Sequence, residues 1–131
     1  KKFETRIFIM RKNHNTRSFD SPDSLIMELF NHNIKGYYLE DLSFHDQVAL
    51  FNQVDLVIAP HGAGLSNILF CHEKVKIIEL MPENDIRLTY YKLASTLCLD
   101  YSCCKIKVNL NNQFEAQNII ENLPALMQTN Q

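Results

Sequence analysis

The residues best suited to chemistry lie in VDLVIAPHGAGLSN, at positions 54–67, where an apolar run leads into a histidine and two glycines. Gly62 and Gly64 are two of only three glycines in the chain. Because glycine has no Cβ, the backbone here can approach a ligand closely and adopt positive φ. If a helix begins near Leu65, its unpaired N–H groups offer a seat for an anion. The pattern therefore predicts a phosphate-binding loop.

Basic and polar side chains supply the other groups that such a site needs. Arg11 and Arg17 follow the apolar segment RIFIM, and a guanidinium group has a permanent charge and a planar fork that fits phosphate oxygens. Ser66 and Asn67 add side-chain donors in the first helical turn. The sequence predicts a diphosphate site made of Arg11, Arg17, Gly62, Ala63, Gly64, Leu65, Ser66 and Asn67.

Each feature also has a purely structural interpretation. A G-x-G after a strand can simply form a tight turn, and both the third glycine of a dinucleotide fingerprint and the GK[ST] of a P-loop are missing. Single arginines in polar loops are more often solvated, and His61 could close the loop through hydrogen bonds to backbone. Glu79 could accept from ribose hydroxyls or act as a capping or salt-bridging acid. Only the joint placement of these residues favours a binding site.

Strand-like and helical segments alternate along the chain. The expected strands are 6–10, 37–39, 55–60, 75–80 and 101–108, and the expected helices are 22–33, 44–53, 65–70, 84 or 85 to 97, and 114–127. We expect Asp20 or Ser21 to cap the first helix and Ser43 to form a capping box with Asp46 at the second. The LVIA core of the third strand has no polar alternation, which is typical of a strand covered on both faces.

This alternation predicts an α/β fold, a Rossmann-like three-layer sandwich with a five-stranded, mainly parallel sheet of order 2-1-3-4-5. In such a sheet, ligands bind beyond the carboxyl ends of the strands where the strand order reverses. That point lies between the first and third strands. Arg11 and Arg17 follow the first of these and His61 follows the third, so two separate features converge on one crevice.

Composition limits the remaining possibilities. The 131 residues, 46% hydrophobic and 21% charged, suit one globular domain spanning 1–131. The net charge of −2 argues against a nucleic-acid surface, and no run reaches the ~20 apolar residues of a membrane span. The four cysteines form no CxxC pair, so we expect no metal site and reduced cysteines packed as small apolar residues. Because the chain starts at Lys1, we expect a fragment of a longer protein.

The loop HGAGLSN resembles the HGAGLTN signature of family 61 glycosyltransferases, which include plant xylosyl- and arabinosyltransferases, animal O-linked N-acetylglucosaminyltransferases and bacterial capsule-type enzymes. RIFIMRKNHNTRSFDSPDSL is similar to the family pattern of two arginines followed by an acidic or amide residue, here Arg11, Arg17 and Asp20, where the family often has Asn. LEDLSFHDQVALFNQVDLVIAPHGAGLSNILF and KIIELMP, which contains Glu79, are also similar. Ser66 replaces a threonine but keeps the hydroxyl.

The resemblance implies the C-terminal, donor-binding half of a GT-B enzyme. Arg11 and Arg17 would contact the diphosphate of a nucleotide sugar, residues 61–67 would form the loop beneath it, and Glu79 would lie near the ribose or base. The implied reaction is inverting, metal-independent sugar transfer from a donor such as a UDP-sugar to a glycan or polysaccharide, without a cofactor. His61 is a candidate general base, although we expect the N-terminal acceptor-side domain to supply the base, and the fragment alone to be inactive.

Two other functions stay open at this stage. One is a non-catalytic nucleotide-binding or regulatory module, and the other is a different Rossmann-like enzyme, such as a phosphosugar isomerase or an oxidoreductase. The missing third glycine counts against a nicotinamide cofactor. For a bacterial or viral protein we expect the cytoplasm, with membrane association as an option, and for a eukaryotic protein the secretory lumen.

Overall fold

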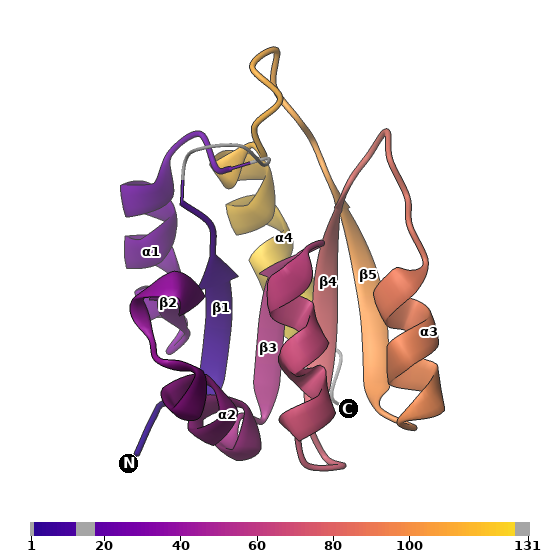
Figure 1. The fold of residues 1–131 in the computed structure, drawn as a ribbon. Coiled ribbons are helices and arrows are strands. Elements are labelled where there is room, and N and C mark those ends of the chain that lie inside the picture. Colours follow the sequence, from indigo (N-terminus) through magenta and orange to yellow (C-terminus); the bar gives the residue numbers. More distant parts are fainter. Residues whose placement is uncertain (1, 13–17, 128–131) are drawn as a thin grey trace.

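The computed structural model describes residues 2–12 and 18–127, which form a five-stranded parallel sheet with helices on both faces (Figure 1). Its neighbouring strands are all parallel, in the order β2-β1-β3-β4-β5. The predicted Rossmann-like fold and strand order are confirmed. The strands are β1 (Arg6–Met10), β2 (Lys35–Tyr38), β3 (Leu56–Pro60), β4 (Lys76–Pro82) and β5 (Asp100–Ile106).

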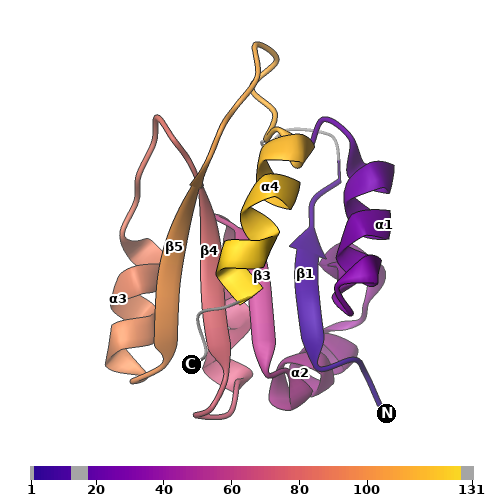
Figure 2. The same cartoon turned by 180° about the vertical axis from the view of Figure 1, so that it is seen from behind.

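Helices form the two outer layers of the sandwich. They are α1 (Pro22–Asn31), α2 (Phe44–Gln53), α3 (Thr89–Thr96) and α4 (Ala116–Met127), with two 3₁₀ helices, η1 (Leu39–Asp41) and η2 (Ala63–Phe70). In Figure 1, α2, η2 and α3 cover the near face of the sheet, and the view from behind in Figure 2 shows α1 and α4 on the other face. Every residue of β3 and β4 is consequently buried. None of the helices in the described ranges is long and apolar enough to cross a bilayer.

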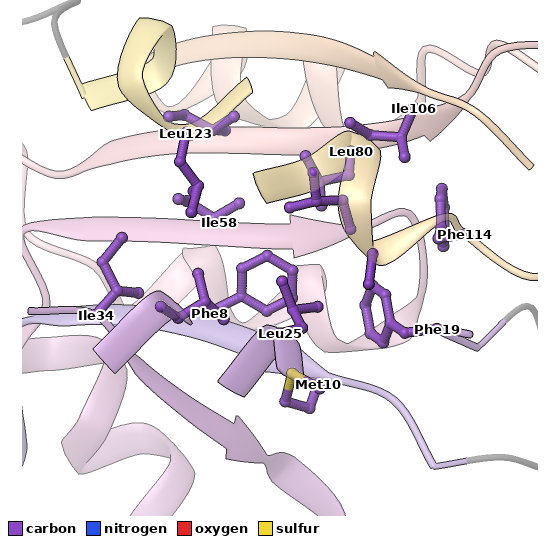
Figure 3. Close-up of a cluster of buried hydrophobic side chains, with 14 of the residues drawn as sticks. Phe8, Met10, Phe19, Leu25, Ile34, Ile58, Leu80, Ile106, Phe114 and Leu123 are labelled. Carbon is purple, nitrogen blue, oxygen red and sulfur yellow. The ribbon is translucent and has the colours of Figure 1, made fainter. Parts of the chain in front are cut away.

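One hydrophobic cluster fills the space between the sheet and the α1/α4 layer (Figure 3). Within it, the Phe19 ring lies 5.6 Å from that of Phe8 and 5.7 Å from that of Phe114, measured between centroids. Backbone hydrogen bonds support this contact, since Phe114 N–H donates to the Ser18 carbonyl and Asp20 N–H donates to the Phe114 carbonyl. Burying each phenyl ring contributes about 1.5–3 kcal/mol. Residues 18–20, which follow β1, are therefore held by these contacts to Phe114, just before α4.

The caps at the helix starts differ in part from expectation. Ser43 accepts a hydrogen bond from Asp46 N–H at 3.0 Å, which confirms that the Ser43 side chain caps α2. Ser21 occupies the cap position of α1 but makes no side-chain cap. Asp20 does not cap α1 either, because its Oδ1 accepts from Ala116 N–H at 2.9 Å and so serves the first turn of α4.

Several element boundaries shift for physical reasons. The helix expected from residue 84 or 85 starts only at Thr89, because the chain after Pro82 first turns over the end of the sheet, with Asp85 N–H bonded to the Pro82 carbonyl. The segment after the glycine loop is a 3₁₀ helix.

All four cysteines are free, but Cys98 and Cys103 are exposed, so the prediction that they pack as apolar residues is wrong for these two.

Candidate functional site

A cleft of about 690 Å³ opens at the carboxyl ends of the strands, beside the tips of β1 and β3. It lies at the reversal of strand order, as the sequence predicts. Most of the predicted site residues line it, namely Arg11, His61, Gly62, Gly64, Leu65, Ser66 and Asn67. Arg17 falls outside the described residues. Glu79 lies directly beneath His61, fully buried, and is not among the lining residues.

Arg11 joins the two strand tips across the floor of the cleft. β1 and β3 are adjacent and parallel, with Phe8 paired to Ile58, so both strands end at the same edge of the sheet. There the Arg11 Nη2 donates a hydrogen bond to the main-chain carbonyl of His61. This contact brings a fixed positive charge directly beside the glycine loop.

Gly62 is required by this approach of the guanidinium group. Its φ of 158° is a conformation that side-chain-bearing residues rarely adopt, and a Cβ added here would collide with Arg11 Nη2. The steric need for glycine is weaker at Gly64, because an added Cβ would come 3.1 Å from Leu39 Cδ1. The loop therefore needs glycine most strongly where the arginine touches it.

Helix η2 starts directly after Gly62, and its first hydrogen bond determines which N–H groups precede the helical ladder. Leu65 N–H donates to the Gly62 carbonyl at 3.1 Å, the first bond of the 3₁₀ ladder. The N–H groups of residues 62–64 precede that bond, as unpaired donors do at a helix start. The Leu65 side chain is buried in the core. Asn67 is held from α2, because its Nδ2 donates to Gln47 Oε1 at 3.0 Å.

A buried carboxylate supports the loop from below. Glu79, on β4, has no exposed side-chain surface, and its Oε2 lies 2.6 Å from His61 Nδ1. Its other oxygen, Oε1, accepts from the Tyr101 hydroxyl on β5, also at 2.6 Å. The carboxylate thus has a partner at each oxygen. His61 lies between it and the cleft with 23% of its side chain exposed.

Two tyrosines complete the surroundings of this carboxylate. Burial raises the pKa of Tyr101, and its hydrogen bond to Glu79 raises that pKa further. Burial also raises the pKa of Tyr90, with a further rise from the Glu79 charge and an opposing effect from Arg11. The Tyr90 ring packs edge-on against the His61 imidazole, with centroids 5.1 Å apart. Both hydroxyls are consequently neutral at physiological pH.

The family model described as Glycosyltransferase 61 matches residues 1–78 of the chain. The chain belongs to glycosyltransferase family 61. Mouse (Mus musculus) "EGF domain-specific O-linked N-acetylglucosamine transferase" is 28% identical over 103 residues. That alignment covers 75% of this chain and 19% of the mouse protein, so the chain spans about one fifth of that relative's length.

Further polar and aromatic lining residues of this family 61 chain were not assigned to the site by the sequence. They are Glu40, Gln47, Asp85, Arg87, Asn112 and Phe114. Asp85 and Arg87 lie in the connection after β4 and form an ion pair at 3.3 Å, while Asn112 and Phe114 follow β5. Their signal is positional, because segments that follow the carboxyl ends of parallel strands gather at one edge of the sheet.

Proposed function

We propose that this cleft binds the diphosphate of a nucleotide sugar, and that the chain is the donor-binding part of an inverting, metal-independent glycosyltransferase. The observation that carries the proposal is the Arg11–His61 contact, which places a guanidinium group against the glycine loop at the strand-order reversal. A volume of about 690 Å³ suits a ligand of that size.

The geometry supplies what a departing diphosphate needs. Arg11 provides charge, the N–H groups of residues 62–64 provide fixed dipoles, and Ser66 provides a hydroxyl. We also assign Arg17 and Ala63 to this group of diphosphate contacts, as the resemblance implies. We assign the stabilisation of the developing charge to these donors. Among the described residues, no group of three or more His, Cys, Asp or Glu residues could hold a metal ion.

In the proposed reaction, an acceptor oxygen forms a bond to the anomeric carbon as the bond from that carbon to the diphosphate breaks. The electron pair stays on the diphosphate, and the acceptor proton passes to a carboxylate or imidazole base on the acceptor-side domain. We propose a UDP-sugar as donor and a hydroxyl of a glycan or polysaccharide, such as a capsule polymer, as acceptor. The name of the mouse relative adds protein hydroxyls as a second acceptor class.

Ligand-induced thermal stabilisation tests donor binding directly. At 100 times its dissociation constant, UDP should stabilise the 131-residue chain by about 2.7 kcal/mol, which corresponds to a Tm increase of roughly 10 °C. Arg11→Ala should remove most of this increase, and Gly62→Ala should do the same by displacing the guanidinium group. Lys12→Ala is the matched control, because Lys12 is an exposed cation that pairs with Asp41 and is not part of the cleft lining.

Four results would contradict the proposal or part of it. Stabilisation by NAD but not by UDP would favour a different Rossmann-like enzyme, and no stabilisation by any nucleotide would overturn donor binding. An equal loss in Arg11→Ala and Lys12→Ala would show that the cleft is not the binding site. Nucleotide binding by a full-length protein that transfers no sugar would instead favour the non-catalytic regulatory module.

A further inference from the structure

Glu79 is the one acidic side chain that is buried in the described part of the chain. An ionised carboxylate loses several kcal/mol of solvation on burial, and the protein must replace it with donors and an opposite charge. The two partners of Glu79 are the Tyr101 hydroxyl, which is neutral, and the His61 imidazole. Only His61 can supply a compensating positive charge.

The contact with Glu79 also determines how the His61 ring is used. Since a carboxylate can only accept, Nδ1 carries a proton and donates it to Oε2 at 2.6 Å. The second ring nitrogen, Nε2, is on the opposite edge of the imidazole, away from the buried carboxylate. Tyr90 packs against the ring and Arg11 holds the His61 carbonyl, so both the side chain and the main chain are fixed.

We propose that Glu79 is a positioning residue that keeps His61 as an imidazolium, with its Nε2–H offered to the cleft as a hydrogen-bond donor for the diphosphate. The inference rests on the proposed function and gives His61 a role on the leaving-group side, beside Arg11 and the glycine loop. It replaces two sequence-based expectations, contact of Glu79 with ribose and proton abstraction by His61. An imidazolium there strengthens its interaction as charge develops on the departing diphosphate.

The charge beside the glycine loop depends on the groups that surround His61. The groups that face its ring are Glu79, Tyr90, Tyr101 and, at the main chain, Arg11. Both tyrosines have raised pKa values and stay neutral, and the arginine stays charged. Asp85 and Arg87 line the same cleft but neutralise each other as an ion pair. Donor affinity should therefore rise on acidification.

The test uses UDP-glucose, because its diphosphate diester carries no group that titrates near neutral pH. Isothermal titration calorimetry should show binding several-fold tighter at pH 6 than at pH 8. His61→Gln should abolish this difference, and Glu79→Gln should remove most of it. Asp55→Asn is the matched control, since Asp55 pairs with His72 on the exposed, opposite end of the sheet and should leave the pH dependence unchanged.

Nitrogen NMR of the imidazole gives a second readout that needs no ligand. In the free chain, His61 should show protons on both Nδ1 and Nε2, and Glu79→Gln should reduce the Nε2 proton signal while the His72 signals stay unchanged. If Glu79→Gln fails to fold, Tyr101→Phe takes its place. That variant leaves the carboxylate with one donor fewer, so its hydrogen bond with His61 Nδ1–H should strengthen and the proton signals of the ring should increase relative to the wild type.

The outcomes separate the two proposals. UDP-glucose binding that is equal at pH 6 and pH 8 overturns the inference alone. Absence of UDP-glucose binding at both pH values overturns the proposed function together with the donor role of His61. A His61 nitrogen signal that ignores both Glu79→Gln and Tyr101→Phe overturns the positioning role of Glu79, whatever the chain binds.

Discussion

Two histidine–carboxylate pairs occupy opposite ends of the same sheet and differ in their surroundings. At the carboxyl end, His61 Nδ1 lies 2.6 Å from Glu79 Oε2, and the carboxylate has no exposed surface. At the amino end, His72 Nε2 lies 3.2 Å from Asp55 Oδ1, with 36% and 64% of the two side chains exposed. Each pair joins an imidazole to a carboxylate. The two pairs therefore differ in burial and in the hydrogen bonds around them, and not in the chemistry of their side chains.

The two pairs should differ in how much they contribute to stability. The Asp55–His72 pair is screened by water and salt, and such pairs contribute about 0–1 kcal/mol. The Glu79–His61 pair has lost that screening and depends on Tyr101 to occupy the second carboxylate oxygen. Only the buried pair borders the cleft. The protein thus accepts a desolvation cost at the pair that borders the cleft.

The largest effect should follow removal of the buried acid. Glu79→Ala leaves the Tyr101 hydroxyl and the His61 Nδ1–H without acceptors and opens a cavity, and we expect a loss of about 3–5 kcal/mol in the free energy of unfolding. Urea unfolding at pH 7 measures it. A loss below about 1 kcal/mol would mean that water reaches the site and that the two pairs are alike.

An intermediate effect should appear at alkaline pH through the tyrosines that donate to carboxylates. Burial and the hydrogen bond to Glu4 raise the pKa of Tyr37 to about 12, and the pKa of Tyr101 is raised as well. Unfolded tyrosine ionises near pH 10. Each tyrosine therefore contributes stability below pH ~10 that is lost as the pH rises through its folded pKa.

Melting curves between pH 9 and 12 should show this loss as a falling Tm. Tyr101→Phe should flatten the fall more than Tyr37→Phe does, because Tyr101 donates to the buried acid and Tyr37 to an exposed one. Equal slopes in the wild type and in Tyr101→Phe would show that Tyr101 ionises without cost in the folded state.

The smallest effect belongs to the exposed pair. Asp55→Asn should change the free energy of unfolding by less than about 1 kcal/mol. In 1 M NaCl, where the Debye length is about 3 Å, the change should vanish. Urea unfolding at low and high salt provides the measurement. A larger, salt-independent loss would place Asp55 in the same class as Glu79.

The fold could be predicted because its signals are local and periodic. Apolar runs such as LVIA mark strands buried on both faces, and the alternation with helices leaves few sheet orders. The order then places Arg11 and His61 at one crevice, and the structure joins them by a hydrogen bond. Neither inference needs knowledge of distant side-chain contacts.

What could not be predicted depends on such contacts. Asp20 precedes α1 in the sequence, yet its carboxylate serves α4, whose Ala116 lies 96 positions away. Glu79 was expected either at the ribose or as a capping or salt-bridging acid, and no local pattern shows that Tyr101 will approach it from β5. The far wall of the cleft comes from loops after β4 and β5, where position in the sheet, and not residue type, determines membership.

The clasp between residues 18–20 and 114–116 also bears on synthesis of the chain. Helix α1 leaves the ribosome before Phe114 and the start of α4, whose partners Phe19 and Asp20 precede α1, and Asp20 and Ala116 are 96 positions apart. Contacts of such long sequence separation form slowly, because the intervening chain must first be ordered. Until α4 is made, the part of this face that α4 covers stays exposed, and a nascent chain stalled before Phe114 would present an apolar surface to chaperones.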